Sequence, residues 1–234
     1  KLSNVTKLSK IVYVSPEPEV ERQYAVMSEE DMDMFNIDAR GIIASVMILV
    51  KEAAKGEEAE FGRMMGTVFG MQCRKLIRDE TLIESLKNEH YDVMITENFD
   101  HCGIGISHLV KPKSVITVST TAIFDLTALY LGLPLVQSYN PSFPSFDVQS
   151  LKHRIRNLYE KSCELLFFYH FKYYSQREFT EYYGPDFPDL GDLTAKSAFH
   201  FTNSEPLIDF ARPILRKIVD LGGLGARPSK PLDK

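Results

Sequence analysis

Hydrophobic patterns typical of strands and of helices alternate along the chain. Residues 91–96 and 114–119 are short apolar runs, the second mostly β-branched, and both predict buried strands. Residues 103–110 between them fit a short helix, so the three segments have the length of a βαβ unit. Residues 198–202 and 217–221 predict two more strands. Because near-continuous apolar strands are typical of a parallel sheet covered on both faces, we expect an α/β fold.

Helical spacing marks two longer stretches. Residues 61–88 carry apolar side chains every three to four positions and predict one or two helices. Residues 150–174 show the same periodicity, with basic residues and a dense aromatic run at 167–174. This segment fits a core helix with a solvated basic face, which periodicity favours, or a membrane-surface or lipophilic-pocket helix. Nearer the amino end, residues 10–15 predict a buried strand and residues 28–31 a helix start.

Composition narrows the class of protein. The 234 residues are 44% hydrophobic and 25% charged, as expected of one large or two small globular domains. The net charge of −5 offers no basic excess for nucleic acid, so we expect no nucleic-acid partner. The longest apolar run, residues 42–50, is too short to cross roughly 30 Å of hydrocarbon as a helix.

The metal-ligand and nucleotide-loop motifs are missing from the sequence. The three cysteines are widely spaced without a Cys-x-x-Cys pair, and the six histidines lack ligand spacing, so we expect no metal site. A chain of this length buries enough surface to need no disulfide staple. The glycines near 103–105 and 222–225 fail the dinucleotide pattern and fit turns.

Residues 97–102, Glu-Asn-Phe-Asp-His-Cys, are the most chemically suggestive stretch. They follow the carboxyl end of a predicted parallel strand, where α/β sheets place ligands. The carboxylates of Glu97 and Asp100 and the imidazole of His101 could act as acid, base or orienting groups. Alternatively, Asn98 and Asp100 cap the next helix and Glu97 faces water, and spacing alone favours this alternative.

Two segments resemble a known family. Residues 201–213, Phe-Thr-Asn-Ser-Glu-Pro-Leu-Ile-Asp-Phe-Ala-Arg-Pro, and residues 217–225, Lys-Ile-Val-Asp-Leu-Gly-Gly-Leu-Gly, resemble the end of the amino-terminal half of UDP-glucuronosyltransferases. Ala211 stands where that family usually has proline. Residues 91–97, followed by Cys102, resemble a strand and loop of the same family. The likeness spans most of the chain after Lys10.

This resemblance implies the amino-terminal half of a GT-B glycosyltransferase, a Rossmann-like parallel sheet with helices on both faces. We expect an acceptor-binding domain at residues 1–225 and the start of an interdomain linker at 226–234. The implied reaction is an inverting transfer of a sugar from a UDP-sugar to a small lipophilic acceptor, with glucuronic acid as the first candidate for that sugar. No cofactor is implied beyond that co-substrate. Because the donor-binding half and the catalytic-histidine loop are expected outside this chain, we expect the chain alone to be inactive.

The resemblance also assigns residues. Glu97 matches the family's acid, usually aspartate, which orients the catalytic histidine, and none of the six histidines here matches that base. This match reverses the preference for Glu97 as a solvent-facing residue. We expect the acceptor wall to include Phe99, Ser119, Thr120, Phe167, Phe168 and Tyr173.

The family is lumenal and membrane-associated, so the resemblance gives meaning to Asn4, which begins an Asn-x-Thr glycosylation sequon. We expect the endoplasmic reticulum lumen, with a membrane surface and a second copy of the chain as candidate partners. Two alternatives stay open. One is a non-catalytic module, derived from a truncated glycosyltransferase, that binds lipophilic ligands or a partner. The other is an enzyme of the same family that uses UDP-glucose or another donor.

Overall fold

The computed structural model describes residues 58–136, 138–142 and 148–223. The strand expected at 10–15, the helix start at 28–31, the sequon at Asn4 and the boundary after residue 225 lie outside these residues.

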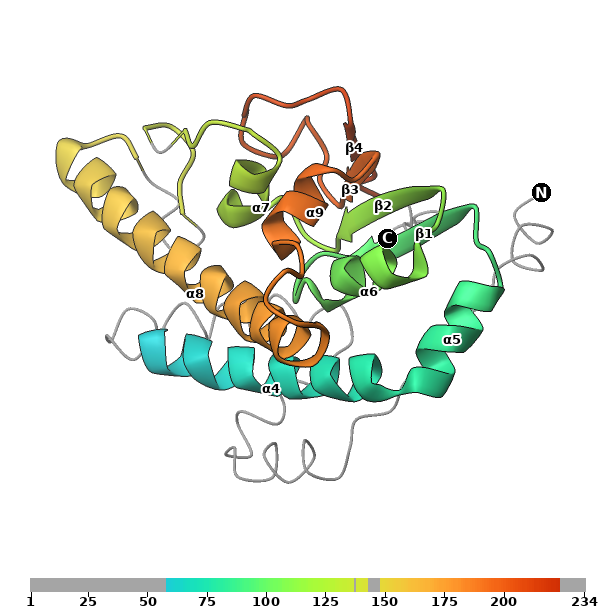
Figure 1. The fold of residues 1–234 in the computed structure, drawn as a ribbon. Helices are drawn as coiled ribbons and strands as arrows, with labels where there is room; N and C mark the ends of the chain where they lie inside the picture. The colour runs from blue at the N-terminus through green and yellow to red at the C-terminus, as the bar shows by residue number, and fades with distance from the viewer. Residues whose placement is uncertain (1–57, 137, 143–147, 224–234) are drawn as a thin grey trace, which may run out of the picture.

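The described part of the chain is built on a parallel four-stranded sheet. Its strands are β1 (Val93–Glu97), β2 (Ser114–Ser119), β3 (Phe199–Thr202) and β4 (Ile218–Asp220), in the order β1-β2-β3-β4 (Figure 1). All neighbours are parallel, with Glu97 opposite Val118 and Ser119 opposite Thr202. The four predicted strands and the α/β class are therefore confirmed, and the carboxyl ends of β1 to β3 meet at one edge.

Six helices accompany these strands in the described residues: α4 (Glu58–Arg78), α5 (Glu80–Asn88), α6 (Cys102–Val110), α7 (Asp125–Tyr130), α8 (Leu151–Tyr183) and α9 (Leu190–Ala195). The predicted helical stretch 61–88 divides at Asp79, whose carboxylate accepts the Leu82 N–H at 2.9 Å and caps α5. Ser150 caps α8 through the His153 N–H. The short helix predicted between β1 and β2 is α6.

The main core lies where α6 and the sheet meet α4, α8 and α9. Ile77, Ile104, Phe179 and Leu190 are almost fully buried there. Helices α4 and α8 lie side by side (Figure 1). Glycines on α4 face α8, and a Cβ added at Gly66 would lie 3.0 Å from a backbone carbonyl oxygen of α8. The two helices therefore approach each other at the level of their backbones.

A disulfide between Cys73 and Cys102 joins α4 to the first residue of α6. Both half-cystines are buried, at 0% and 2% exposure. Local spacing does not indicate this pair, because 29 residues separate the two cysteines and only the tertiary fold brings them together.

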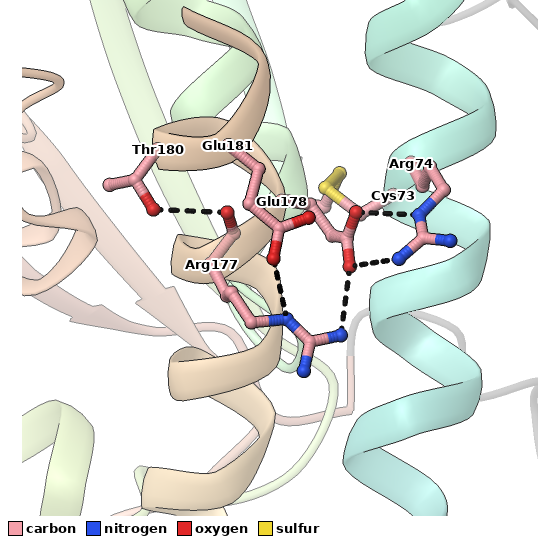
Figure 2. Close-up of polar contacts among 7 residues, drawn as sticks. Cys73, Arg74, Arg177, Glu178, Thr180 and Glu181 are labelled. Atoms are coloured by element: carbon pink, nitrogen blue, oxygen red, sulfur yellow. Dashed lines mark hydrogen bonds and ion pairs between the residues drawn. A yellow bond between two sulfur atoms is a disulfide. The ribbon is translucent and has the colours of Figure 1, made fainter. Parts of the chain in front are cut away.

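Beside the disulfide, a cluster of charged side chains links the same two helices (Figure 2). Arg74 on α4 donates to both carboxylate oxygens of Glu178 on α8, at 2.7 and 2.9 Å, and Arg177 donates to one of them at 3.2 Å. Burial by itself raises the pKa of Glu178, but these hydrogen bonds outweigh it and lower the pKa. Glu178 is therefore an ionised, paired carboxylate inside the α4–α8 interface.

Candidate functional site

The carboxyl edge of the sheet is held together by Glu97, Thr120 and Asn203, which follow or end three neighbouring strands. The Thr120 N–H donates to Glu97 Oε1 at 3.4 Å. The Asn203 side-chain amide donates to the Thr120 carbonyl at 3.0 Å, and the Asn203 N–H donates to the Ser119 carbonyl at 3.1 Å. The Asn203 bonds hold the segment after β2, and the Thr120 N–H in turn contacts the Glu97 carboxylate at the edge where parallel α/β sheets bind ligands.

The environment of Glu97 suits proton chemistry near neutral pH. The side chain is half-buried, and burial raises its pKa to about 7. The Thr120 N–H acts against this rise in pKa, whereas the negative charge of Asp100 adds to it. A carboxyl group with a pKa near the working pH can change its protonation state during a reaction cycle, and such groups cluster at functional sites.

The loop after Glu97 turns its other polar side chains inward. Asn98 is buried, donates to Thr127 Oγ1 at 3.0 Å and accepts from Thr194 Oγ1 at 3.2 Å, so it ties the loop to α7 and α9. Asp100 Oδ1 accepts the N–H of Cys102, the first residue of α6, at 3.0 Å, whereas the N-cap residue of α6 is His101. The alternative expectation for this loop is thus met in part by Asp100, whose side chain satisfies one N–H at the start of α6, whereas Asn98 bridges two helices.

His101 is a buried histidine that does not bond to Glu97. Its ring packs edge-on against Tyr130, and neither ring nitrogen has a hydrogen-bond partner within the described residues. Burial, helped by the charge of Lys172, lowers its pKa to about 3. The ring is therefore neutral at physiological pH, and the geometry gives it no part in orienting an acid or base with Glu97.

A cluster of six phenylalanines lies beside this loop. Phe99 is at its centre, with ring centroids 5.7 Å from Phe168 and 5.2 Å from Phe171. The Phe168 ring in turn lies 4.1 Å from that of Phe124, which follows β2, with the two rings tilted by 36°. We call Phe69, Phe99, Phe124, Phe167, Phe168 and Phe171 the aromatic cluster.

The structure brings together only some of the predicted acceptor-wall residues. Phe99, Phe167 and Phe168 join the aromatic cluster, and Thr120 is exposed at the same edge of the sheet. Ser119 is buried, with its hydroxyl 3.1 Å from a ring nitrogen of His200.

Tyr173 is 48% exposed, and its ring contacts in the described chain are with neighbouring tyrosines of α8. The sequence does not single out Phe69 and Phe124 as wall residues, and Phe171 is included only as part of the aromatic run at 167–174. Their only local signal is that they are apolar residues within predicted helices or after a predicted strand.

In the described ranges, no three His, Cys, Asp or Glu side chains are grouped so that they could hold a metal ion. Within the same ranges, none of the helices combines the length and the apolar character that crossing a bilayer requires.

Comparison with known proteins identifies the family. The family profile described as "UDP-glucoronosyl and UDP-glucosyl transferase" matches residues 4–234, which is nearly the whole chain. The chain belongs to the UDP-glucuronosyltransferase family. The resemblance in the two sequence segments is therefore confirmed.

Several relatives of this UDP-glucuronosyltransferase-family chain come from mammals. It is 35% identical over 176 residues to human UDP-glucuronosyltransferase 3A1, covering 70% of this chain and 31% of that protein. It is 34% identical to bovine UDP-glucuronosyltransferase 3A1 over 70% of this chain and 31% of that protein. Human UDP-glucuronosyltransferase 3A2 is 30% identical over 77% of this chain and 35% of that protein. The chain thus spans about a third of the length of these curated relatives, and no solved structure matches it.

Proposed function

We propose that this chain is the acceptor-binding part of an inverting UDP-glycosyltransferase that moves a sugar, glucuronic acid as first candidate, from UDP to a small lipophilic acceptor. The observation that carries the proposal is the Glu97 carboxylate, with a pKa of about 7, at the carboxyl edge of the sheet beside the aromatic cluster. The names of the mammalian relatives support glucuronic acid as the transferred group.

The proposed chemistry divides the work between groups. A histidine from outside this chain, since none of its six histidines matches the family's base, takes the proton of the acceptor hydroxyl while the hydroxyl oxygen attacks the anomeric carbon. The bond to UDP breaks, and UDP leaves with the electron pair. Glu97 accepts a hydrogen bond from the imidazole, which fixes its tautomer and stabilises its charged form. The apolar body of the acceptor lies against the aromatic cluster, where ring contacts add to the hydrophobic gain.

The experiment replaces Glu97 in the enzyme that contains this chain. Glu97→Gln keeps the size and removes the charge, so turnover should fall on the order of 10²-fold or more with little change in the KM for the acceptor. The pH dependence of turnover should change as well, and Glu97→Asp should recover part of the activity. Glu84→Gln, an equal charge change at an exposed position of α5, is the control. Activity within a few-fold of the parent for Glu97→Gln would reject the role of Glu97.

We also propose that the chain alone binds acceptor without turnover. A small fluorescent phenol such as 4-methylumbelliferone should bind the purified chain, with no glucuronide formed from added UDP-glucuronate. Product that depends on the purified chain would contradict this proposal. Ligand binding without turnover even by the longer protein would favour the alternative of a non-catalytic binding module.

The exposed side of α8 supports a membrane surface as a partner. Ile155 and Tyr159 are each 63% exposed, and the basic residues Lys152, Arg154 and Arg156 are exposed among them. Apolar and basic side chains on one helix suit the interface of an anionic bilayer. Co-sedimentation with phosphatidylserine vesicles should therefore fall for the double variant Ile155→Ser/Tyr159→Ser. Unchanged sedimentation would remove this helix as the contact.

The proposed location is the lumen of the endoplasmic reticulum. The buried Cys73–Cys102 disulfide supports an oxidising compartment, because disulfides rarely persist in the cytosol. The sequon at Asn4 adds to this. Endoglycosidase treatment of the protein from secretory cells should shift its mobility, and Asn4→Gln should abolish the shift. A parent protein that shows no shift would contradict glycosylation at Asn4.

A further inference from the structure

A cavity of about 440 Å³ opens at the amino edge of the sheet, opposite the edge that holds Glu97. It lies between the second half of α6, the turn from α6 into β2, and the segment from α9 into β3. Strand β2 runs from this cavity, at Ser114, to the candidate site, at Ser119, so about 16 Å of extended chain separate the two edges. The volume is within the range of small-molecule sites.

The lining of this cavity has two chemically different parts. Ile104, Val115 and Leu193 contribute apolar side chains, and all three belong to, or pack against, the main core. Lys111, Lys113 and Lys196 also line the cavity and are exposed. None of the residues that line it is acidic.

The charge of the lysines is largely uncompensated. Lys113 donates to Asp92 at 2.5 Å, but both side chains are mostly exposed, so this pair is weak. Lys111 and Lys196 form no ion pair in the part of the chain that the structure describes. The carboxyl end of α6 adds a partial negative charge there, which the ammonium groups outweigh.

We propose that this cavity binds an amphipathic organic anion, whose carboxylate or phosphate head meets Lys111 and Lys196 and whose apolar body covers the half-buried side chains of Val115 and Leu193. Burial of the body supplies most of the affinity. The lysines act as point charges that select an anionic head. Because they are exposed, their contribution weakens as salt screens them. The site is independent of the sugar transfer proposed above, which involves the other edge.

The test titrates the purified chain by calorimetry with octanoate, octyl phosphate, 1-octanol and inorganic phosphate, below micellar concentrations. Octanoate and octyl phosphate should bind at least ten-fold more tightly than 1-octanol or inorganic phosphate. Equal binding of octanoate and 1-octanol would overturn the proposal. Tighter binding of one anion than the other would identify the preferred head group.

Charge removal and mapping then locate the site. Lys111→Gln/Lys196→Gln should weaken octanoate binding ten-fold or more, whereas Arg63→Gln/Lys87→Gln, an equal charge change at exposed basic residues outside the cavity, should not. A photoactivatable octanoate analogue should label peptides from residues 104–115 or 193–198. Labelling confined to the aromatic cluster would assign the anion to the acceptor site and refute a second site. That outcome would leave the proposed function standing.

Discussion

Replacing both Cys73 and Cys102 by alanine removes a cross-link that closes a 29-residue separation between α4 and α6. In the chain-entropy model, opening a loop of this length costs about 3.5 kcal/mol of stability at 25 °C. For a chain of this size, urea unfolding has a slope of about 3 kcal/mol/M. The midpoint should therefore fall by about 1 M in the double variant.

The assay is urea unfolding followed by far-ultraviolet circular dichroism, with and without reductant. When the parent is fully unfolded and reduced, its urea midpoint should fall to that of the double variant. Reductant should not change the midpoint of the double variant. Cys163→Ala, at the cysteine outside the disulfide, is the matched control and should keep the parent's midpoint. In the native oxidised protein at most one thiol, that of Cys163, should react with a thiol reagent, because Cys73 and Cys102 are joined in the disulfide. Equal midpoints for parent and double variant would refute the cross-link as a stabilising element.

Three further substitutions test the packing of α8. Arg74→Met removes the main partner of the Glu178 carboxylate, which is 2% exposed. The free energy of unfolding should fall by about 2 kcal/mol, less than for a fully buried pair because the arginine is 41% exposed. The lowered pKa of Glu178 means that this contribution is present above about pH 4.5 and lost below it, so parent and variant unfolding midpoints should converge in acid. Lys161→Met leaves the buried Asp125 without its ion-pair partner, so the free energy of unfolding should fall by about 3–5 kcal/mol in thermal unfolding. Adding Asp125→Leu should recover part of this loss. Gly66→Ala should lower the thermal midpoint although alanine favours helices by about 1 kcal/mol, because the new Cβ meets a backbone carbonyl that cannot move aside. A rise in the midpoint for Gly66→Ala, or none of the losses for the other two, would contradict the described contacts.

The parts of the fold that follow from local pattern could be predicted. The four strands are short apolar runs, and α6 sits between two of them, so their positions could be inferred from residues next to one another. Glu97 could be placed at a strand end for the same reason. The rise of its pKa could not be predicted, because it depends on burial by the surrounding fold.

Contacts between segments that are distant in the chain could not be predicted from the sequence. The aromatic cluster joins Phe69, Phe99, Phe124 and Phe171 from four separate elements or loops, and no local spacing indicates such a meeting. Ser119 illustrates a second limit. Its hydroxyl contacts His200 on the neighbouring strand, a pairing that only the register between β2 and β3 decides.

The close approach of α4 and α8 sets the dimensions of the aromatic cluster. Gly62, Gly66 and Gly70 recur every fourth residue, so together they form a smooth groove along α4 in which the rings and backbone of α8 rest. One ring of the cluster comes from α4 and three come from α8. The spacing between these rings therefore depends on the distance between the two helix axes. Larger residues in that groove would widen the gap between the rings without altering any of them. Under the proposed function, the size of the acceptor would then depend on α4 positions that the acceptor does not touch.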